Sequence, residues 1–253
     1  QFLDPGGGLA ELEKILLRSE SETVFKEDPL RLLRAFRIAS QLSFKIEPKT
    51  LAMIGALRQR VRRPAGERIR SELMALLAVP GCSRWLRLMD EIEILTTLFD
   101  DLEPARTCAT VYYGPGGVLT HSLDTAARAD FLLNNLSTVF PGQAQIIEGH
   151  LESRSKEGNP FKAVLMLAAL LHDVSKAETA KQVGGRLRFF GHDAKGAKRA
   201  AAILKRLKFS RDHIDTVSNV IANHLRPGNL GSGPAITDKA VYRFFRDLGD
   251  DAA

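Results

Sequence analysis

The sequence is poor in cysteine and aromatic residues, and it has no long apolar run. Its 253 residues include 2 cysteines and 1 tryptophan, and aromatic residues make up 7% of the chain. Cys82 and Cys108 stand alone, without metal-type spacing or partners for a disulfide framework, which indicates a reducing compartment. There is no signal peptide and no stretch long enough to cross a bilayer. We therefore expect a cytoplasmic protein with no membrane partner.

The composition that remains is that of a globular protein. Hydrophobic residues make up 44% and charged residues 26%, and the length suffices for one large or two modest domains. The formal net charge is +6 and the isoelectric point is about 9.4. This mild basicity suits an RNA partner without requiring one.

Apolar residues recur at helical spacing along most of the chain, which predicts an all-α fold with at most one short hairpin. The hairpin is expected around Gly184-Gly185, and residues 134–160 are expected to form an irregular, partly mobile inserted loop. The predicted helical segments cover residues 9–18, about 29–42, and 47 to the arginines before Pro64. The next helix carries Arg68 to Leu77 and is closed by Pro80-Gly81, and others cover parts of 83–110, begin at Thr120-His121, and cover 161–171 and 195–211.

The stretch from Glu27 to Arg37 opens a helix and carries a possible recognition pair. Asp28 is a good N-cap, and Pro29 suits the first helical position. The Asp28 carboxylate could accept from the amino group of cytosine or adenine, while the Arg31 guanidinium donates to the ring nitrogen of the same base. Arg34 continues the same basic stripe. The alternative is a helix cap with an incidental ion pair.

A basic cluster follows the next predicted helix. We interpret it as a surface for RNA phosphates, which would position an acceptor stem without reading its sequence. The alternative is a solvated face. The residues are Arg58, Arg60, Arg62 and Arg63, followed by Arg68 and Arg70. A second basic stretch, from Lys195 to Arg211, is interpreted first as a solvated face and second as an RNA-facing surface.

Four histidines and one aspartate form a candidate metal site. The apolar run 161–171 predicts a buried helix, and His172 and Asp173 follow it directly. A buried histidine and carboxylate need partners, and a divalent metal satisfies both. The alternative is a set of core histidines bonded to backbone carbonyls. The candidate ligands are His121, His172, Asp173, His192 and His224, whereas His150 and His213 receive no role.

Residues 25–37, with Leu42, Phe44, Ile46 and Glu47, closely resemble the neck of bacterial class II tRNA nucleotidyltransferases and poly(A) polymerases. The resemblance continues through residues 67–73. It implies that an E-D-x-x-R motif formed by Glu27, Asp28 and Arg31 reads the incoming CTP or ATP, and we add Arg34 to this nucleotide-binding set. It also implies tRNA or another RNA 3′ end as the partner.

Residues 170–176 resemble the H-D-x-x-K core of HD-superfamily phosphohydrolases, and segments 190–192 and 223–227 resemble those that follow it. By this resemblance His121, His172 and Asp173 are metal ligands, and His192 and His224 complete a second metal position. Lys176 would face a substrate phosphate. Imidazole ligands suit Mn, Fe, Ni or Zn. The superfamily's later aspartate has no good counterpart, because Asp247, Asp250 and Asp251 are poorly placed.

Residues 1–17 resemble the last segment of the family's catalytic head, but the head's Asp-x-Asp pair and phosphate loop have no counterpart. The expected organisation is therefore the tail of a head (1–20), a neck (21–82) and a helical HD-type body (83–253). Mg or Mn for nucleotide transfer would belong to the missing head, so these residues alone are not expected to add nucleotides.

Three hypotheses follow. The first is a neck-and-body fragment of a template-independent RNA nucleotidyltransferase, adding either CCA or poly(A). The second is a metal-dependent HD phosphohydrolase acting on nucleotides or RNA ends. The third is an RNA-binding module with a vestigial HD site. The sequence leaves the metal and the oligomeric state open.

Overall fold

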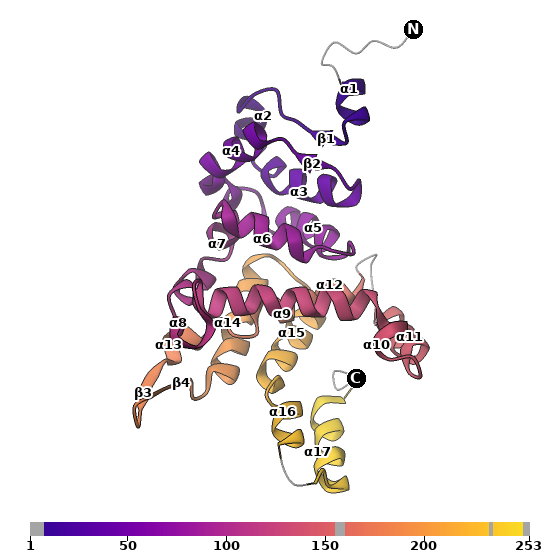
Figure 1. The fold of residues 1–253 in the computed structure, drawn as a ribbon, viewed down its shortest axis with the longest axis vertical. Helices are drawn as coiled ribbons and strands as arrows, with labels where there is room; N and C mark the ends of the chain where they lie inside the picture. Colours follow the sequence, from indigo (N-terminus) through magenta and orange to yellow (C-terminus); the bar gives the residue numbers. More distant parts are fainter. Residues whose placement is uncertain (1–7, 155–159, 233–234, 250–253) are drawn as a thin grey trace. The chain divides into compact units, whose positions relative to one another are not determined.

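The computed structural model describes residues 8–154, 160–232 and 235–249, and the chain divides into two compact units, residues 1–100 and 101–253. The described residues form helices with only a few short strands (Figure 1), so the predicted all-α fold class is confirmed. Within the described residues, no helix combines the length and the apolar character needed to cross a membrane.

The first unit is built around the packing of α3 on α5. Leu32 and Phe36 on α3 and Leu73 on α5 are fully buried, and the ring of Phe36 meets Trp85 edge to face at 6.4 Å. These residues recur at the spacing of one helix face, which is why the segments fold as amphipathic helices. The elements are α1 (Gly8–Glu13), β1 (Leu16–Leu17), α2 (Thr23–Glu27), α3 (Arg31–Gln41), β2 (Lys45–Ile46), α4 (Pro48–Ala56), η1 (Arg58–Arg62), α5 (Gly66–Leu77), α6 (Ser83–Glu91) and α7 (Ile94–Leu98).

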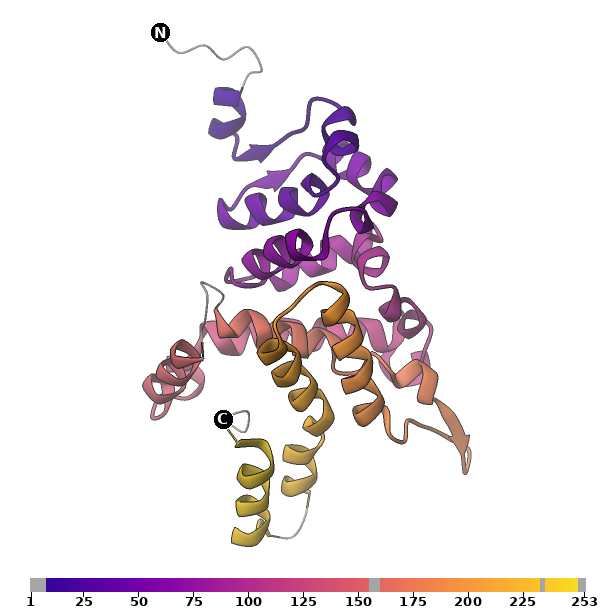
Figure 2. The ribbon, with the colours of Figure 1, turned by 180° about the vertical axis from the view of Figure 1, so that it is seen from behind.

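The start of this unit differs from the sequence expectation. The helix expected over residues 9–18 ends at Glu13, because Ile15 adopts a left-handed backbone with φ of 53°. The chain then extends, and β1 pairs in parallel with β2 (Figure 2). Contacts also group α6 and α7 with this unit, whereas the sequence assigned residues 83–100 to the body. The predicted domain boundaries stay a prediction.

In the second unit, α12 packs against both α9 and α15, and α14 packs along α15. This arrangement brings the ends of α12 and α15 and the start of α14 together. The elements are η2 (Asp100–Arg106, which begins on the last residue of the first unit), α8 (Thr110–Tyr113), α9 (Gly117–Asn134), α10 (Leu136–Val139), α11 (Ala144–Ser153), α12 (Phe161–Leu171), α13 (Lys176–Thr179), β3 (Lys181–Val183), β4 (Arg186–Arg188), α14 (His192–Arg206), α15 (Arg211–Asn223), α16 (Arg226–Gly231) and α17 (Asp238–Leu248).

Two expectations for this unit need correction, and one is confirmed. The predicted loop over 134–160 contains α10 and α11, and Ala144 and Ile147 mark the inner face of α11; residues 155–159 lie outside the described part. The helix predicted over 195–211 ends at Arg206, because Lys208 has φ of 58°, and α15 begins only at Arg211. The hairpin is confirmed: β3 and β4 are antiparallel, and Gly184 and Gly185 both have positive φ, as a type I′ turn requires.

Candidate metal centre and nucleotide-facing neck

The central carboxylate of the candidate site, that of Asp173, lies just after the buried helix α12. Eight of its residues, from Phe161 to Leu171, are buried, so the chain that leaves it is still inside the unit. His172 is the C-cap residue, and the Asp173 side chain that follows is 1% exposed. An ionised carboxylate at this depth is costly unless it is paired or metal-bound.

Four imidazoles from separate parts of the fold surround this carboxylate. Their Nε2 atoms lie 3.0 Å (His172) and 3.4 Å (His121) from Oδ2 of Asp173, and 3.4 Å (His192) and 3.7 Å (His224) from its Oδ1. His121 comes from α9, His192 begins α14, and His224 caps α15. Two groups of these ligand atoms lie close enough together to hold a metal ion. One group is His121, His172 and Asp173, and the other is Asp173, His192 and His224.

A small residue allows α14 to approach this centre. A Cβ atom at Gly196 would lie 3.3 Å from the Ile221 side chain and 3.5 Å from the His172 carbonyl. The contact with Ile221 is tight and the contact with the carbonyl is an ordinary van der Waals one, so a side chain larger than a methyl group would push α14 away from α15. The glycine therefore helps to hold His192 near Asp173.

The backbone fixes three of the imidazoles in the form that a metal ligand needs. The Nδ1 atoms of His172, His192 and His224 lie 2.9, 2.7 and 2.7 Å from backbone carbonyls three residues earlier. A carbonyl only accepts, so each Nδ1 must donate and carry the ring proton. In the neutral ring the Nε2 lone pair then faces Asp173.

This arrangement leaves buried acceptors facing one another. Both carboxylate oxygens of Asp173 and the Nε2 atom of His192 are buried and lack an aligned hydrogen bond from the described residues. Lone pairs on nitrogen and on carboxylate oxygen repel unless a cation lies between them. The donor set and its unsatisfied atoms therefore fit a divalent metal, with imidazole and carboxylate as ligands.

One cation of the chain already reaches the carboxylate. The Lys176 ammonium lies 2.6 Å from Oδ2 of Asp173 and donates to the Tyr113 hydroxyl at 2.8 Å. The Tyr113 ring in turn stacks on His121, with centroids 4.6 Å apart and an interplanar angle of 22°. Lys176 is only 9% exposed, so it points into the cluster rather than into open solvent.

The electrostatics of the cluster favour an ionised Asp173 and a neutral His224. Burial alone would raise the pKa of Asp173, but neighbouring groups, among them the Lys176 ammonium, hold that pKa far below its usual range. Burial lowers the pKa of His224. Burial also opposes the charge of Lys176, but the Asp173 carboxylate raises its pKa, so it stays charged.

In the first unit, the start of α3 carries the predicted nucleotide-binding residues. The prediction of Asp28 as the N-cap is wrong: α3 begins at Arg31, two residues after the predicted Pro29, and its N-cap is Leu30. Asp28 is extended and ends α2, and its Oδ1 accepts from the Leu30 amide at 3.3 Å in the turn before α3. Its carboxylate pairs with Arg68 at 3.2 Å, whereas Arg31 donates to the Val24 carbonyl at 3.1 Å. Asp28 and Arg31 are therefore bonded to other groups, Arg68 and the Val24 carbonyl. Glu27 is exposed.

Arg31 and Arg34 line a cavity of about 340 Å³ in this unit, together with Val24, Phe25 and Ala35. A buried glutamate holds the Arg34 side chain at this cavity. Glu72 on α5 accepts from Arg34 at 2.9 Å and from Arg37 at 2.5 Å. The Arg34 guanidinium is therefore held at the cavity by a carboxylate that is itself 7% exposed.

The six basic residues predicted to contact RNA have different surroundings. Arg58 pairs with Glu93 at 2.8 Å. Arg62 donates to the Thr97 carbonyl and pairs with Asp100 at 3.3 Å. Arg68 pairs with Asp28, as noted above. Among the described residues, Arg60 and Arg63 form no ion pair, and Arg70 is half-buried on α5.

Two family descriptions match the chain. "Probable RNA and SrmB- binding site of polymerase A" matches residues 43–106, and "HD domain" matches residues 118–243. The A-adding tRNA nucleotidyltransferase of Deinococcus radiodurans is 30% identical over 232 residues, which cover 89% of this chain and 48% of that protein. The CC-adding enzyme of Geobacter sulfurreducens is 34% identical over 173 residues, covering 68% and 36%.

The chain belongs to the family of bacterial tRNA nucleotidyltransferases and poly(A) polymerases.

Solved structures of other proteins have the same fold as this nucleotidyltransferase family member. The CCA-adding enzyme of Thermotoga maritima complexed with tRNA matches with a TM-score of 0.58 and 19% identity, over 99% of this chain and 48% of that one. A structure described as a tRNA-processing enzyme complex matches with a TM-score of 0.64 and 17% identity, over 99% and 55%. The chain thus spans about half the length of the D. radiodurans relative.

The structure of this family member brings together all five residues predicted for the metal site, and it adds two residues that the sequence did not indicate. Tyr113 lies 63 positions before Lys176, and Glu72 lies 38 positions after Arg34. The only local signal for Tyr113 is its position in a short segment beside the glycine turn that starts α9. Glu72 interrupts an otherwise apolar face of α5, where a buried carboxylate implies cationic partners.

Proposed function

We propose that the chain supplies the nucleotide-reading neck and the HD-type body of a template-independent RNA nucleotidyltransferase that acts on the 3′ end of tRNA or a related RNA. The observation that carries this proposal is the placement of Arg31 and Arg34 on one cavity of the neck. Family membership supports it. The substrates would be CTP and ATP, and the transfer metal, Mg or Mn, would be held outside these residues.

Base selection in this proposal depends on Asp28 and Arg31. Their side chains offer an acceptor and a donor, the pattern that complements cytosine and adenine but not uracil or guanine. The present partners leave room for this role. A carboxylate has about four lone-pair sites, so Asp28 could keep Arg68 and still accept from a base. Arg31 has further N–H groups beyond the one given to Val24.

Nucleotide binding to the chain tests this proposal. Titration calorimetry with CTP, ATP, UTP and GTP should show tighter binding of the first two, and Arg31→Ala should abolish the difference. Arg87→Ala on α6 removes the same charge elsewhere in the unit and should change nothing. Equal affinity for all four nucleotides in the unchanged chain would contradict the proposed role of the neck.

The same proposal assigns RNA phosphate contacts to the six arginines from Arg58 to Arg70 described above. Arg60 and Arg63 are the best placed for this role, because no carboxylate among the described residues occupies them. Binding through phosphates should weaken steeply with salt. The lack of a disulfide among the described residues and the tRNA-directed names of the relatives support a cytoplasmic location.

The body favours a second function, a metal-dependent phosphohydrolase. The observation that carries it is the set of buried, unsatisfied acceptors formed by Asp173 and His192 among the four imidazoles. A bound divalent ion would supply Lewis-acid activation of water and of a phosphate oxygen. Lys176 supplies a fixed positive charge beside that position, where it can hold a phosphate oxygen. His172, His192 and His224 keep their Nε2 lone pairs directed at the site.

A panel of metals and generic phosphoesters tests this second function. The chain should hydrolyse bis-p-nitrophenyl phosphate or p-nitrophenyl phosphate with Mn, Fe, Ni or Zn, and Asp173→Asn should remove the activity. His213→Ala, on α15 away from the cluster, is the matched control. Metal binding without any hydrolysis would favour a vestigial site.

A further inference from the structure

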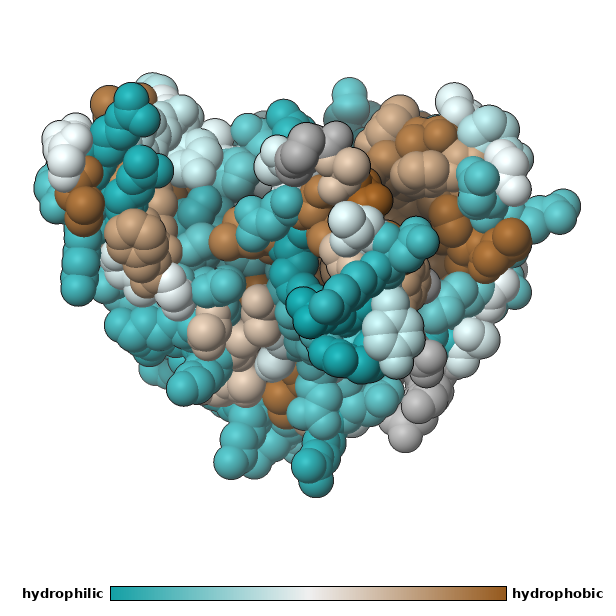
Figure 3. Space-filling model, turned by 90° about the horizontal axis from the view of Figure 1, so that it is seen from below, coloured by the Kyte–Doolittle hydropathy of each residue, from teal (hydrophilic) through white to brown (hydrophobic). Residues whose placement is uncertain are grey.

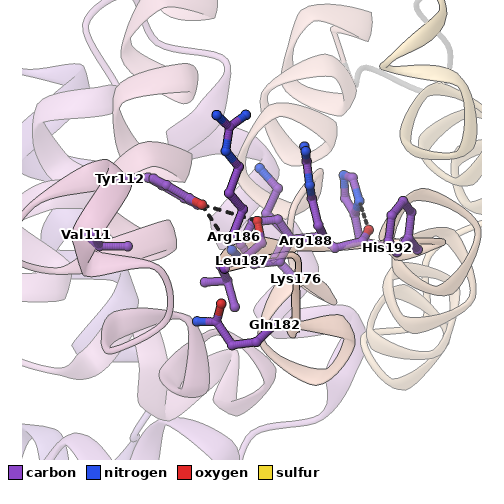
Figure 4. Close-up of a pocket in the computed structure, with 11 residues that line it drawn as sticks. Val111, Tyr112, Lys176, Gln182, Arg186, Leu187, Arg188 and His192 are labelled. Atoms are coloured by element: carbon purple, nitrogen blue, oxygen red, sulfur yellow. Dashed lines mark hydrogen bonds between the residues drawn. The ribbon is translucent and has the colours of Figure 1, made fainter.

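A cavity of about 800 Å³ opens beside the metal cluster, between α8 and the β3–β4 hairpin (Figure 4). Lys176 and His192 line it, and both also contact Asp173. The cavity therefore leads to the candidate metal centre. Its volume is that of a site for a small molecule or for the end of a chain.

The lining of this cavity carries charge of one sign. Lys176, Arg186 and Arg188 contribute cations, and none of the 11 lining residues is acidic. Arg186 and Arg188 are exposed and form no ion pair among the described residues. The cavity is therefore suited to an anionic ligand.

The β3–β4 hairpin that carries these arginines places two like charges opposite each other. Arg188 pairs directly across the ladder with Lys181, and Arg186 pairs with Val183. Like charges directly opposite each other destabilise a two-stranded ladder. A polyanion bound along this face would relieve the repulsion between Arg188 and Lys181. A surface that only faces solvent would have no need for this pair of like charges.

The spacing of the two arginines indicates the kind of anion. They are two residues apart on β4, so they project from the same face about 6.6–6.8 Å apart along the strand. Successive phosphates of a nucleic-acid strand have similar spacing. A mononucleotide has one phosphate, so both arginines would lack a phosphate once Lys176 holds it at the centre.

Two aromatic residues complete the site. The Tyr112 hydroxyl accepts from the Leu187 amide at 3.1 Å and donates to its carbonyl at 3.3 Å, which fastens the hairpin to α8 (Figure 4). Phe190 lines the cavity and is 71% exposed. Figure 3 shows the surface from below, where separate hydrophobic patches lie among hydrophilic side chains. An exposed phenyl ring beside arginines is a stacking platform for an unpaired base.

We propose that this cavity binds the end of a single-stranded RNA, with Arg186 and Arg188 on successive phosphates and Phe190 stacked on a base, so that the terminal phosphoester reaches Lys176 and the Asp173 cluster. The inference rests on the proposed phosphohydrolase function for what happens to that phosphoester. The binding itself requires no hydrolysis, so the two can fail separately.

Fluorescence anisotropy with a labelled single-stranded RNA hexamer, in EDTA, tests the phosphate contacts. Arg186→Ala/Arg188→Ala should weaken binding at least about tenfold and reduce the magnitude of the log Kd–log salt slope by about 1.4, which is 0.7 for each lost contact. The control Lys239→Ala/Arg243→Ala removes the same charge from exposed positions of α17. An equal loss in both double variants would mean non-specific attraction and would overturn the proposal.

Photocrosslinking locates the RNA end, because the neck is also proposed to bind RNA. A hexamer with 4-thiouridine at its 3′ end should crosslink to peptides from residues 181–192 or 110–113. Phe190→Ala should lower that yield and weaken binding about fivefold or more, without changing affinity for inorganic phosphate. Crosslinks confined to the neck would overturn the assignment, as would unlabelled uridine monophosphate competing as well as the hexamer. Metal affinity, measured separately, should be unchanged in the hairpin variants.

Discussion

The Nε2 atom of His172 lies 3.0 Å from Oδ2 of Asp173, although its Nδ1 atom is already committed to the Ala169 carbonyl. Two acceptors therefore face each other in a buried place. The same relationship recurs for His192 and His224 on the other carboxylate oxygen. Such an arrangement is stable only with a cation at its centre, and the ammonium of Lys176 supplies one charge at most.

Tyr113→Phe should destabilise the body unit. The substitution removes the hydroxyl that accepts from the buried Lys176 ammonium but keeps the ring that stacks on His121. A hydrogen bond to a charged group is worth about 1.5–3 kcal/mol, so we expect a loss of this order in urea unfolding with EDTA present. Tyr112→Phe is the matched control and should cost less, because that hydroxyl is exposed and bonds neutral backbone groups. Equal stability of the two variants would contradict the role given to Tyr113.

Glu72→Gln should destabilise the neck and weaken nucleotide binding together. The buried carboxylate holds Arg34 and Arg37, and its loss leaves two guanidiniums without their partner. Those side chains are 35% and 24% exposed, so solvent reduces the cost to about 1–3 kcal/mol. Glu67→Gln, on the exposed face of α5, should change the unfolding free energy by less than about 0.5 kcal/mol. An unchanged unfolding midpoint for Glu72→Gln would show that the ion pairs of Glu72 with Arg34 and Arg37 contribute nothing to stability.

Metal affinity should depend on pH in a defined direction. A protonated imidazole cannot bind a metal, and burial lowers the pKa of His224 below its ordinary value. The neutral form therefore persists to lower pH than for a solvated histidine, whose pKa is about 6.5. Equilibrium dialysis from pH 5 to 8 should show constant affinity near neutrality and a decrease only below about 6.5. A decline that begins above pH 7 would contradict the electrostatics described here.

The sequence pointed to the five residues that the structure brings together around Asp173 because local patterns mark them; their role as metal ligands stays a prediction. The apolar run 161–171 indicates burial, and His172 and Asp173 follow it directly, so their depth could be inferred. Tyr113 and Glu72 could not be found in this way, because their partners are distant in the chain and come close only through the packing of α8, α3 and α5. The parallel pairing of Leu16–Leu17 with Lys45–Ile46 was missed for the same reason.

Other misses were local. The helix α11 was hidden by polar residues and by Gly149 within it, although Ala144 and Ile147 already had helical spacing. The start of α3 was placed early because Asp28 and Pro29 are good N-terminal residues, yet both lie in the turn before the helix and Leu30 is the N-cap. Capping chemistry thus located the helix to within a few residues.

Metal binding by the purified chain tests the central claim most directly. Titration calorimetry of Mn or Zn into metal-free protein should show one or two sites per chain. Asp173→Asn should weaken binding at least about tenfold, since it changes the ligand shared by both groups and even changes to supporting partners cost 10–100-fold. His150→Ala, which alters a histidine on α11, should bind as the unchanged chain does. Equal affinity of Asp173→Asn and the unchanged chain would contradict the proposed centre.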